Sequence, residues 1–196
     1  MGKKRRLTKS AILVAAAHIA DQSSSGDVTL LELAAKLGVK MPSLYNHLQG
    51  QNGLRQELAV YAIEQLRAAL TNVALGRSSA EAIRAMCSVY LDFSGKHPGL
   101  YRAMLRLPDP NEKQLRAANH RVLQLLLTIL APYRLSKADA IHAVRTWRAM
   151  LHGFVSLEMT GAFSHLPRRF DSFQFMVAMF VKSLDSRRLE RTRKDI

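Results

Sequence analysis

Cysteine is nearly absent from this chain, with Cys87 alone among 196 residues. A single thiol cannot form an internal disulfide or a cysteine-rich metal cluster, which agrees with a reducing compartment and leaves a redox-sensing role open. Glycine and proline are also sparse, at ten and six residues, so the composition excludes collagen-like and low-complexity chains. The length and a hydrophobic fraction of 48% suffice for a globular core in one or two domains.

Long apolar runs are missing as well. The longest, residues 11–17 and 175–181, fall far short of the roughly 20 residues that a membrane-spanning helix needs. The basic start of the chain has the charge of a signal peptide, but the apolar run behind it is short and is closed by His18 and Asp21. We therefore expect a cytoplasmic protein without membrane contact.

Acidic residues are few relative to basic ones, with 15 Asp and Glu against 29 Lys and Arg, for a net charge of +14. Such an excess favours a polyanionic partner, because cations that neutralise phosphates release condensed counterions. Residues 1–55 carry eight basic and three acidic side chains, and the rest of the excess is spread over the remaining chain. Charge alone therefore does not locate a binding face, and a merely soluble basic protein remains an alternative.

Apolar residues recur at helical spacing nearly everywhere, and no segment alternates with the period of a strand, so the pattern predicts an all-α fold. In the first helix the inner face should carry Ile12, Ala15, Ala16 and Ile19. The expected helices cover residues 7–21, 30–38, 41–48, 53–75, 80–96, 98–106, 111–130, 137–162 and 170–188.

Two of these helices form a helix-turn-helix motif. Thr29 and Glu32 have the spacing of a capping box, and Gly38 suits the left-handed residue at which a helix often ends. Pro42 is tolerable in the first turn of the helix that follows. Six apolar residues can form the buried seam: Leu33, Ala34, Leu37, Val39, Leu44 and Leu48. An ordinary helical hairpin is the alternative.

The outer face of the second helix is predicted to contact DNA. Lys40, Tyr45 and His47 can donate to phosphates, and Ser43 or Asn46 can reach base edges in a major groove. The predicted DNA-contacting residues are Thr29, Lys40, Met41, Pro42, Ser43, Tyr45, Asn46 and His47. A basic arm either follows an adjacent groove or is a solvated tail; it comprises Lys3, Lys4, Arg5, Arg6 and Lys9.

This region resembles the tetracycline-repressor family, also called TetR/AcrR regulators. The resemblance rests on Leu33-Ala34, Leu37-Gly38-Val39, residues 43–48 and Leu54, which stand at the family's spacing. It implies that residues 41–48 are the recognition helix, with Tyr45 and His47 on phosphates and residues 40–43 nearest the bases. Lys40 replaces a small capping residue, Gln51 replaces a phosphate-contacting lysine, and Leu30 and Leu31 replace positions that are polar in some members.

The segment 147–158 resembles the C-terminal domain of a TetR subgroup named for Trp, His and Gly, here Trp147, His152 and Gly153. The resemblance implies a DNA-binding domain over residues 1–55 and an effector-binding and dimerisation domain over 56–196. It also implies a homodimer through the last two long helices. The last helix has more apolar surface than one intramolecular stripe needs, unless all of it is core: Phe170, Phe173, Phe175, Met176, Met179 and Phe180.

The resemblance further implies a cavity for a small-molecule effector. Its candidate lining residues are Tyr90, Phe93, Tyr101, Met104, His120, Trp147 and His152, although aromatic residues at helical spacing are also the usual core. No cofactor or metal is expected, because the seven histidines lack paired ligand spacing and no phosphate loop is present. Enzyme activity is not expected.

The sequence thus predicts a ligand-responsive transcriptional regulator, more often a repressor in this family. Its dimer would bind a palindromic double-stranded DNA operator and release it when an effector binds. Two alternatives stay open at this point. One is a non-specific architectural DNA-binding protein, and the other is a helical ligand carrier or enzyme with a vestigial hairpin.

Overall fold

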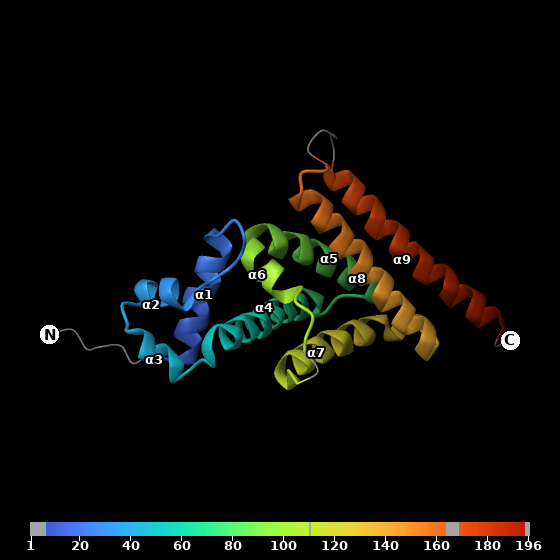
Figure 1. The fold of residues 1–196 in the computed structure, drawn as a ribbon. Coiled ribbons are helices and arrows are strands. Elements are labelled where there is room, and N and C mark those ends of the chain that lie inside the picture. The colour runs from blue at the N-terminus through green and yellow to red at the C-terminus, as the bar shows by residue number, and fades with distance from the viewer. Residues whose placement is uncertain (1–6, 110, 164–168, 195–196) are drawn as a thin grey trace. The chain divides into compact units, whose positions relative to one another are not determined.

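The structure is a computed structural model that describes residues 7–109, 111–163 and 169–194. Within those ranges it contains helices and no β-strand, so the all-α prediction is confirmed (Figure 1). The elements are α1 (Lys9–Gln22), α2 (Leu30–Leu37), α3 (Met41–Tyr45), α4 (Gly50–Ala74), α5 (Ser79–Lys96), α6 (Pro98–Met104), α7 (Lys113–Leu130), the short 3-10 helix η1 (Ala131–Tyr133), α8 (Lys137–Met159) and α9 (Arg169–Lys194).

The chain forms two compact units. Unit 1 comprises residues 1–66 and 93–119, and unit 2 comprises residues 67–92 and 120–196. The helices α4, α5 and α7 each run from one unit into the other without a break. The boundaries of the compact units therefore differ from the predicted boundary between a DNA-binding and an effector-binding domain after residue 55. That functional boundary stays a prediction.

In unit 1, α1 packs against both α2 and α6. Its buried side chains are Ile12, Leu13, Ala16, Ala17 and Ala20. Ala15 and Ile19, which the sequence also predicted on the inner face, are half-buried and lie at its edge. Two neighbouring helices cover α1 instead of one, so the buried arc is wider than a single stripe and is turned toward Leu13 and Ala17.

The contact between α1 and α6 is unusually close. A Cβ atom added at Gly99 would lie 2.1 Å from the backbone carbon and oxygen of Ala20, so this crossing requires glycine. The neighbouring carboxylate of Asp21 accepts hydrogen bonds from the backbone N–H groups of Gly99 and Leu100, both at 3.0 Å. Its second oxygen lies 2.8 Å from Nδ1 of His97. Asp21 therefore satisfies donors in the first turn of α6, which have no partner within that helix.

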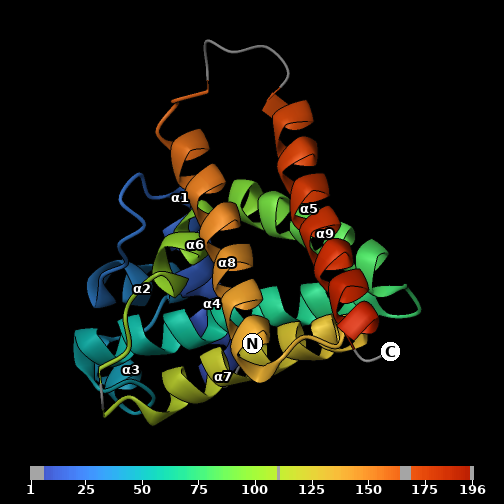
Figure 2. The same cartoon turned by 90° about the vertical axis from the view of Figure 1, so that its right-hand side faces the viewer.

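In unit 2, α8 and α9 run in opposite directions alongside each other (Figure 2). Aromatic side chains fill the space between them: the rings of Trp147 and Phe180 are 5.8 Å apart, and Phe154 lies 5.0 Å from Phe173. The helix α8 ends at Met159, three residues before the predicted end, and Gly161 follows in the left-handed conformation. The helix α9 is longer than predicted and continues to Lys194.

The described helices include none that combines the length and the hydropathy needed to cross a membrane.

The glycine at the α1–α6 crossing predicts a large and local effect on stability. Gly99→Ala should lower the free energy of unfolding by about 3 kcal/mol, because the added methyl meets backbone that cannot move aside. Gly95→Ala is the matched control, since nothing lies within 4 Å of a Cβ there. Equal denaturation midpoints for the two variants in guanidinium chloride would contradict the close crossing.

Candidate DNA-binding site

The start of α2 is fixed by hydrogen bonds between Thr29 and Glu32. The backbone N–H of Glu32 donates to Thr29 Oγ1 at 3.2 Å, while the Thr29 N–H donates to Glu32 Oε2 at 2.9 Å. The Thr29 hydroxyl also donates to that carboxylate, and these bonds lower the pKa of Glu32. The predicted capping box is therefore confirmed.

The turn after α2 contains the predicted left-handed glycine. Gly38 has φ 64° and ψ 34°, and the N–H of Val39 donates to the carbonyl of Ala34 at 3.1 Å. The next helix, α3, begins at Met41 with Pro42 in its first turn but ends at Tyr45 instead of the predicted Leu48. Leu48 is nevertheless buried, and its N–H still donates to the carbonyl of Leu44 at 2.9 Å; Gly50, at φ 66°, then begins α4.

The predicted seam between α2 and α3 is largely present. Leu33 and Leu44 are fully buried, and Ala34 and Leu48 are nearly so. Leu37 and Val39 are only half-buried, because they lie at the turn, where one side remains open. This seam holds the two helices as a helix-turn-helix, with the opposite face of α3 available to a partner.

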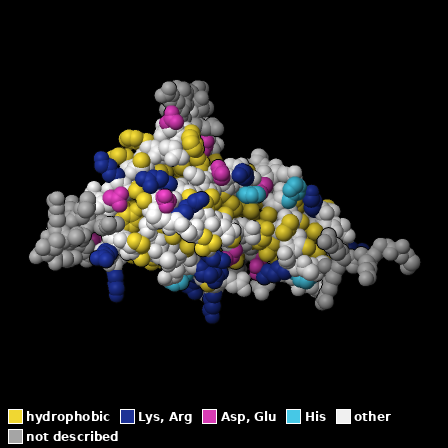
Figure 3. Space-filling model, turned by 180° about the vertical axis from the view of Figure 1, so that it is seen from behind, with side chains coloured by type: hydrophobic (Ala, Val, Ile, Leu, Met, Phe, Trp, Pro, Cys, Tyr) yellow, Lys and Arg dark blue, Asp and Glu magenta, His cyan; other side chains and the backbone are white. Residues whose placement is uncertain are grey.

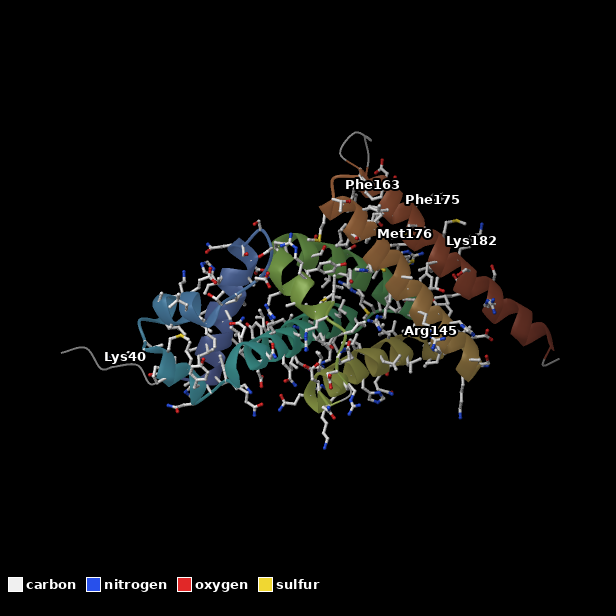
Figure 4. The ribbon with its side chains drawn as sticks, viewed as in Figure 1. Lys40, Arg145, Phe163, Phe175, Met176 and Lys182 are labelled. Carbon is white, nitrogen blue, oxygen red and sulfur yellow. The ribbon has the colours of Figure 1, made fainter. Side chains whose placement is uncertain are left out.

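Most of the predicted DNA-contacting side chains are accessible. Lys40, Pro42, Tyr45 and Asn46 are exposed, Tyr45 to 56%, while Met41, Ser43 and His47 are half-buried. Lys40 stands at the N-cap of α3, and its side chain makes no capping hydrogen bond (Figure 4). Thr29 is exposed, but its hydroxyl is engaged with Glu32. Their contacts with DNA remain predictions.

The basic arm and the overall charge add little to this picture. Lys9 forms an ion pair with Glu57 of α4 at 2.6 Å, and the other arm residues lie outside the described ranges. On the face of the molecule seen in Figure 3, Lys and Arg side chains are scattered instead of gathered in one patch. The geometry of the helix-turn-helix identifies the candidate interface.

One residue of this region has a role that sequence reasoning missed. Gln51, the second residue of α4, turns inward and is half-buried. Its Nε2 donates to the carbonyl of Val28 at 2.6 Å, and its Oε1 accepts from the N–H of Leu30 at 3.1 Å. Only the amide, which can donate and accept at once, hinted at this role in the sequence.

The predicted effector-lining residues are divided between the units. Phe93, Tyr101 and Met104 belong to unit 1, whereas Tyr90, His120, Trp147 and His152 belong to unit 2. Phe93, Tyr101 and Trp147 are buried, while Tyr90 and Met104 are half-buried. His120 and His152 are exposed, and His120 lies 3.2 Å from the side-chain nitrogen of Gln124 on the same helix. Effector binding by these residues remains a prediction.

Cys87 lies in the core of unit 2 beside Trp147, whose indole Nε1 donates to its sulfur at 3.1 Å. Burial raises the pKa of the thiol to about 12, and the hydrogen bond from Trp147 offsets only part of that shift. The thiol is thus protonated at neutral pH, which is the opposite of a reactive redox-sensing cysteine.

The residues that the structure describes include no group of three or more His, Cys, Asp or Glu side chains arranged to hold a metal ion.

The helices α2 and α3 are joined by a turn at Gly38, share a buried seam, and leave the polar outer face of α3 exposed. These features define the class of helix-turn-helix DNA-binding proteins. Residues 83–180 match the family model described as "Tetracyclin repressor-like, C-terminal domain", a range that includes Trp147, His152 and Gly153. The chain belongs to the TetR family of transcriptional regulators.

Individual proteins agree with this assignment. The chain is 32% identical over 185 residues to the uncharacterized HTH-type transcriptional regulator YobS of Bacillus subtilis (strain 168), covering 94% of this chain and 96% of that protein. It is 31% identical to the HTH-type regulator Rv0681 of Mycobacterium tuberculosis (strain ATCC 25618 / H37Rv), over 82% of this chain and 74% of that protein. A solved structure of a protein with unknown function from Rhodococcus sp. RHA1 has a TM-score of 0.77 at 21% identity, covering 92% of this chain and 97% of that one.

The buried thiol gives a test of the core of unit 2. At pH 9, alkylation of Cys87 by iodoacetamide should be slower in the native protein than in the unfolded chain by a factor of roughly several hundred, the ratio of the two thiolate fractions. Because the folded pKa lies above the unfolded one, the contribution of the thiol to stability is present below about pH 8.5 and is lost toward pH 12. Comparable alkylation rates in the two states, measured by mass spectrometry, would contradict this burial.

Proposed function

We propose that this chain is a ligand-responsive repressor that binds a palindromic operator as a homodimer in the bacterial cytoplasm and releases it when a small molecule binds. The observation that carries the proposal is the exposed face of α3, with Lys40 and Tyr45, on the DNA-binding head, the helices α1 to α3, whose seam is buried. Membership of the family and the names of the two regulators support it. Neither relative is named as an enzyme, and catalysis forms no part of the proposed function.

DNA recognition is proposed to follow from the shape of the head. With α3 in the major groove, the first residues of the helix lie nearest the base edges, and the side chains at its end reach the backbone. Tyr45 and His47 would donate to phosphates, and Lys40 would add a charged contact. Residues 41–43 and Asn46 would then face the bases, where an amide or a hydroxyl can discriminate between base pairs.

Dimerisation through α8 and α9 is supported by apolar side chains that unit 2 leaves uncovered. Of the six residues considered on the last helix, Phe173 and Phe180 are core, and Met176 is half-buried. Phe175 is 69% exposed on α9 (Figure 4), and Met179, about one helical turn further on, is 52% exposed. Phe170 is exposed at 59%, and Leu157 on α8 at 48%. A second copy of α8 and α9 would bury these side chains, in the way that two-fold dimers pair identical surfaces.

Release of DNA requires an effector that prefers one conformation of the dimer. A ligand of equal affinity for the operator-binding and released forms shifts nothing, so the effector must bind the released form more tightly. Three helices pass unbroken from unit 2 to unit 1. A shift of unit 2 on effector binding would therefore be carried along α4, α5 and α7.

The first experiment selects bound fragments from a random double-stranded DNA pool at near-physiological salt with excess competitor. Recovery of one palindromic motif with regular half-site spacing supports a sequence-specific dimer. Enrichment without any motif would favour a non-specific architectural protein, whose affinity depends on salt but not on sequence. Absence of DNA binding would leave a ligand carrier or enzyme.

A charge substitution tests the placement of Lys40. Lys40→Ala should weaken operator binding and should reduce the slope of log K against log salt by about 1.8 per dimer, because each subunit loses one phosphate contact. Lys113→Ala, an exposed lysine on α7, is the control and should keep the slope of the unaltered protein. An unchanged slope for Lys40→Ala, read from fluorescence anisotropy titrations, would remove Lys40 from the interface.

The proposed dimer face is tested by a buried charge. Phe175→Glu should convert the dimer to monomer in sedimentation velocity, because a carboxylate in an apolar interface is costly unless it is paired. Leu107→Glu is the control, since Leu107 is 86% exposed in unit 1 and lies outside the face. A Phe175→Glu protein that stays dimeric would place the interface elsewhere.

A further inference from the structure

Gln51 joins two helix starts that lie far apart in the sequence. Its amide spans from the second residue of α4 to the backbone on both sides of Thr29, with bonds of 2.6 Å to Val28 and 3.1 Å to Leu30. The two bonds run in opposite directions, one donated and one accepted. The amide therefore pairs with this backbone as a neighbouring peptide group would.

Neither a lysine nor an ionised glutamate at position 51 could make both bonds. A lysine can only donate, so the N–H of Leu30 in the first turn of α2 would lose its acceptor, and an ionised glutamate can only accept. Val28 and Leu30 are 5% and 6% exposed. Buried backbone groups that lose a partner are costly, so position 51 is fitted to an amide.

These bonds join the two ends of the helix-turn-helix segment, residues 28–51, so that the chain and the hydrogen bonds together form a closed ring. The chain runs from the start of α2 through the Gly38 turn and α3 to the start of α4, and Gln51 returns to the start of α2, 21 residues back. The helix α3 is part of the segment that the bonds close. The seam of Leu33 and Leu44 holds α3 against α2, and Gln51 fixes the other end of the segment.

We propose that Gln51 is a positioning residue for operator recognition: its neutral two-bond clamp sets the orientation of α3, and Gln51 itself does not contact a phosphate. The inference rests on the proposed DNA-binding function. Base readout requires α3 in one orientation, whereas non-specific binding depends on charge near the phosphates. Loss of the clamp should therefore weaken specific binding more than non-specific binding.

The test uses Gln51→Met in the full-length protein, since methionine keeps the length of the side chain and removes both hydrogen bonds. Operator affinity should fall by roughly three- to tenfold, while affinity for random-sequence DNA stays within about twofold and the salt slope is unchanged. Hydrogen exchange of the Leu30 amide should become faster. Gln65→Met, at an exposed position of the same helix, should match the unaltered protein in every measurement.

Gln51→Lys separates the clamp from a direct phosphate contact. The lysine should raise the salt slope by up to about 1.8 per dimer and strengthen non-specific binding, but it should not restore the preference for the operator. All titrations are made at a temperature at which circular dichroism shows each variant to be folded.

Three results would overturn the inference. Equal losses of affinity on operator and random DNA in Gln51→Met, with the salt slope unchanged, would make Gln51 a direct contact, because a neutral amide on a phosphate adds affinity without neutralising charge. Unchanged operator affinity despite faster exchange at Leu30 would make the clamp purely structural. An unaltered protein that binds no DNA would instead overturn the proposed function, and this inference with it.

Discussion

Unit 1 depends on the close crossing of α6 over the end of α1. The backbone of α6 can lie on Ala20 only because residue 99 has no side chain. Once the helices are this close, the carboxylate of Asp21 reaches the first N–H groups of α6, where its negative charge is also favoured by the helix dipole. This contact brings residues 93–119 into the same compact unit as the helix-turn-helix, although more than 70 residues separate Asp21 from Gly99 and Leu100.

Helix starts are held by the same chemistry elsewhere in the chain. Thr29, Glu32 and Gln51 serve the start of α2, and the Ser136 hydroxyl accepts from the Asp139 N–H at the start of α8. The helix α3 differs, because the side chain of Lys40 at its N-cap offers no acceptor. Its orientation therefore depends on the buried Leu44 and on the ring that Gln51 closes. A short helix held in this way can present its outer face without using that face for its own stability.

The last helix shows how one segment can serve a core and a partner. Phe173, Val177 and Phe180 face the interior of unit 2, while Phe175 and Met179 remain on the outside. Two apolar stripes on one helix are more than a single core needs. Under the proposed function the second stripe lies in the dimer interface, and the geometry of that interface sets the spacing of the two heads on DNA.

The helical fold, the helix-turn-helix and the family could be predicted from the sequence, because these depend on local patterns. The capping box at Thr29, the left-handed turn at Gly38 and the apolar seam of Leu33 and Leu44 all act within a few residues or across one turn. The roles of Gln51, Asp21 and Gly99 became visible only in the folded chain. Each pairs with backbone between 21 and 79 residues away, and no local spacing indicates such a partner. The tertiary structure also decided which aromatic residues of α9 are buried, because that depends on the surface of α8 packed against them.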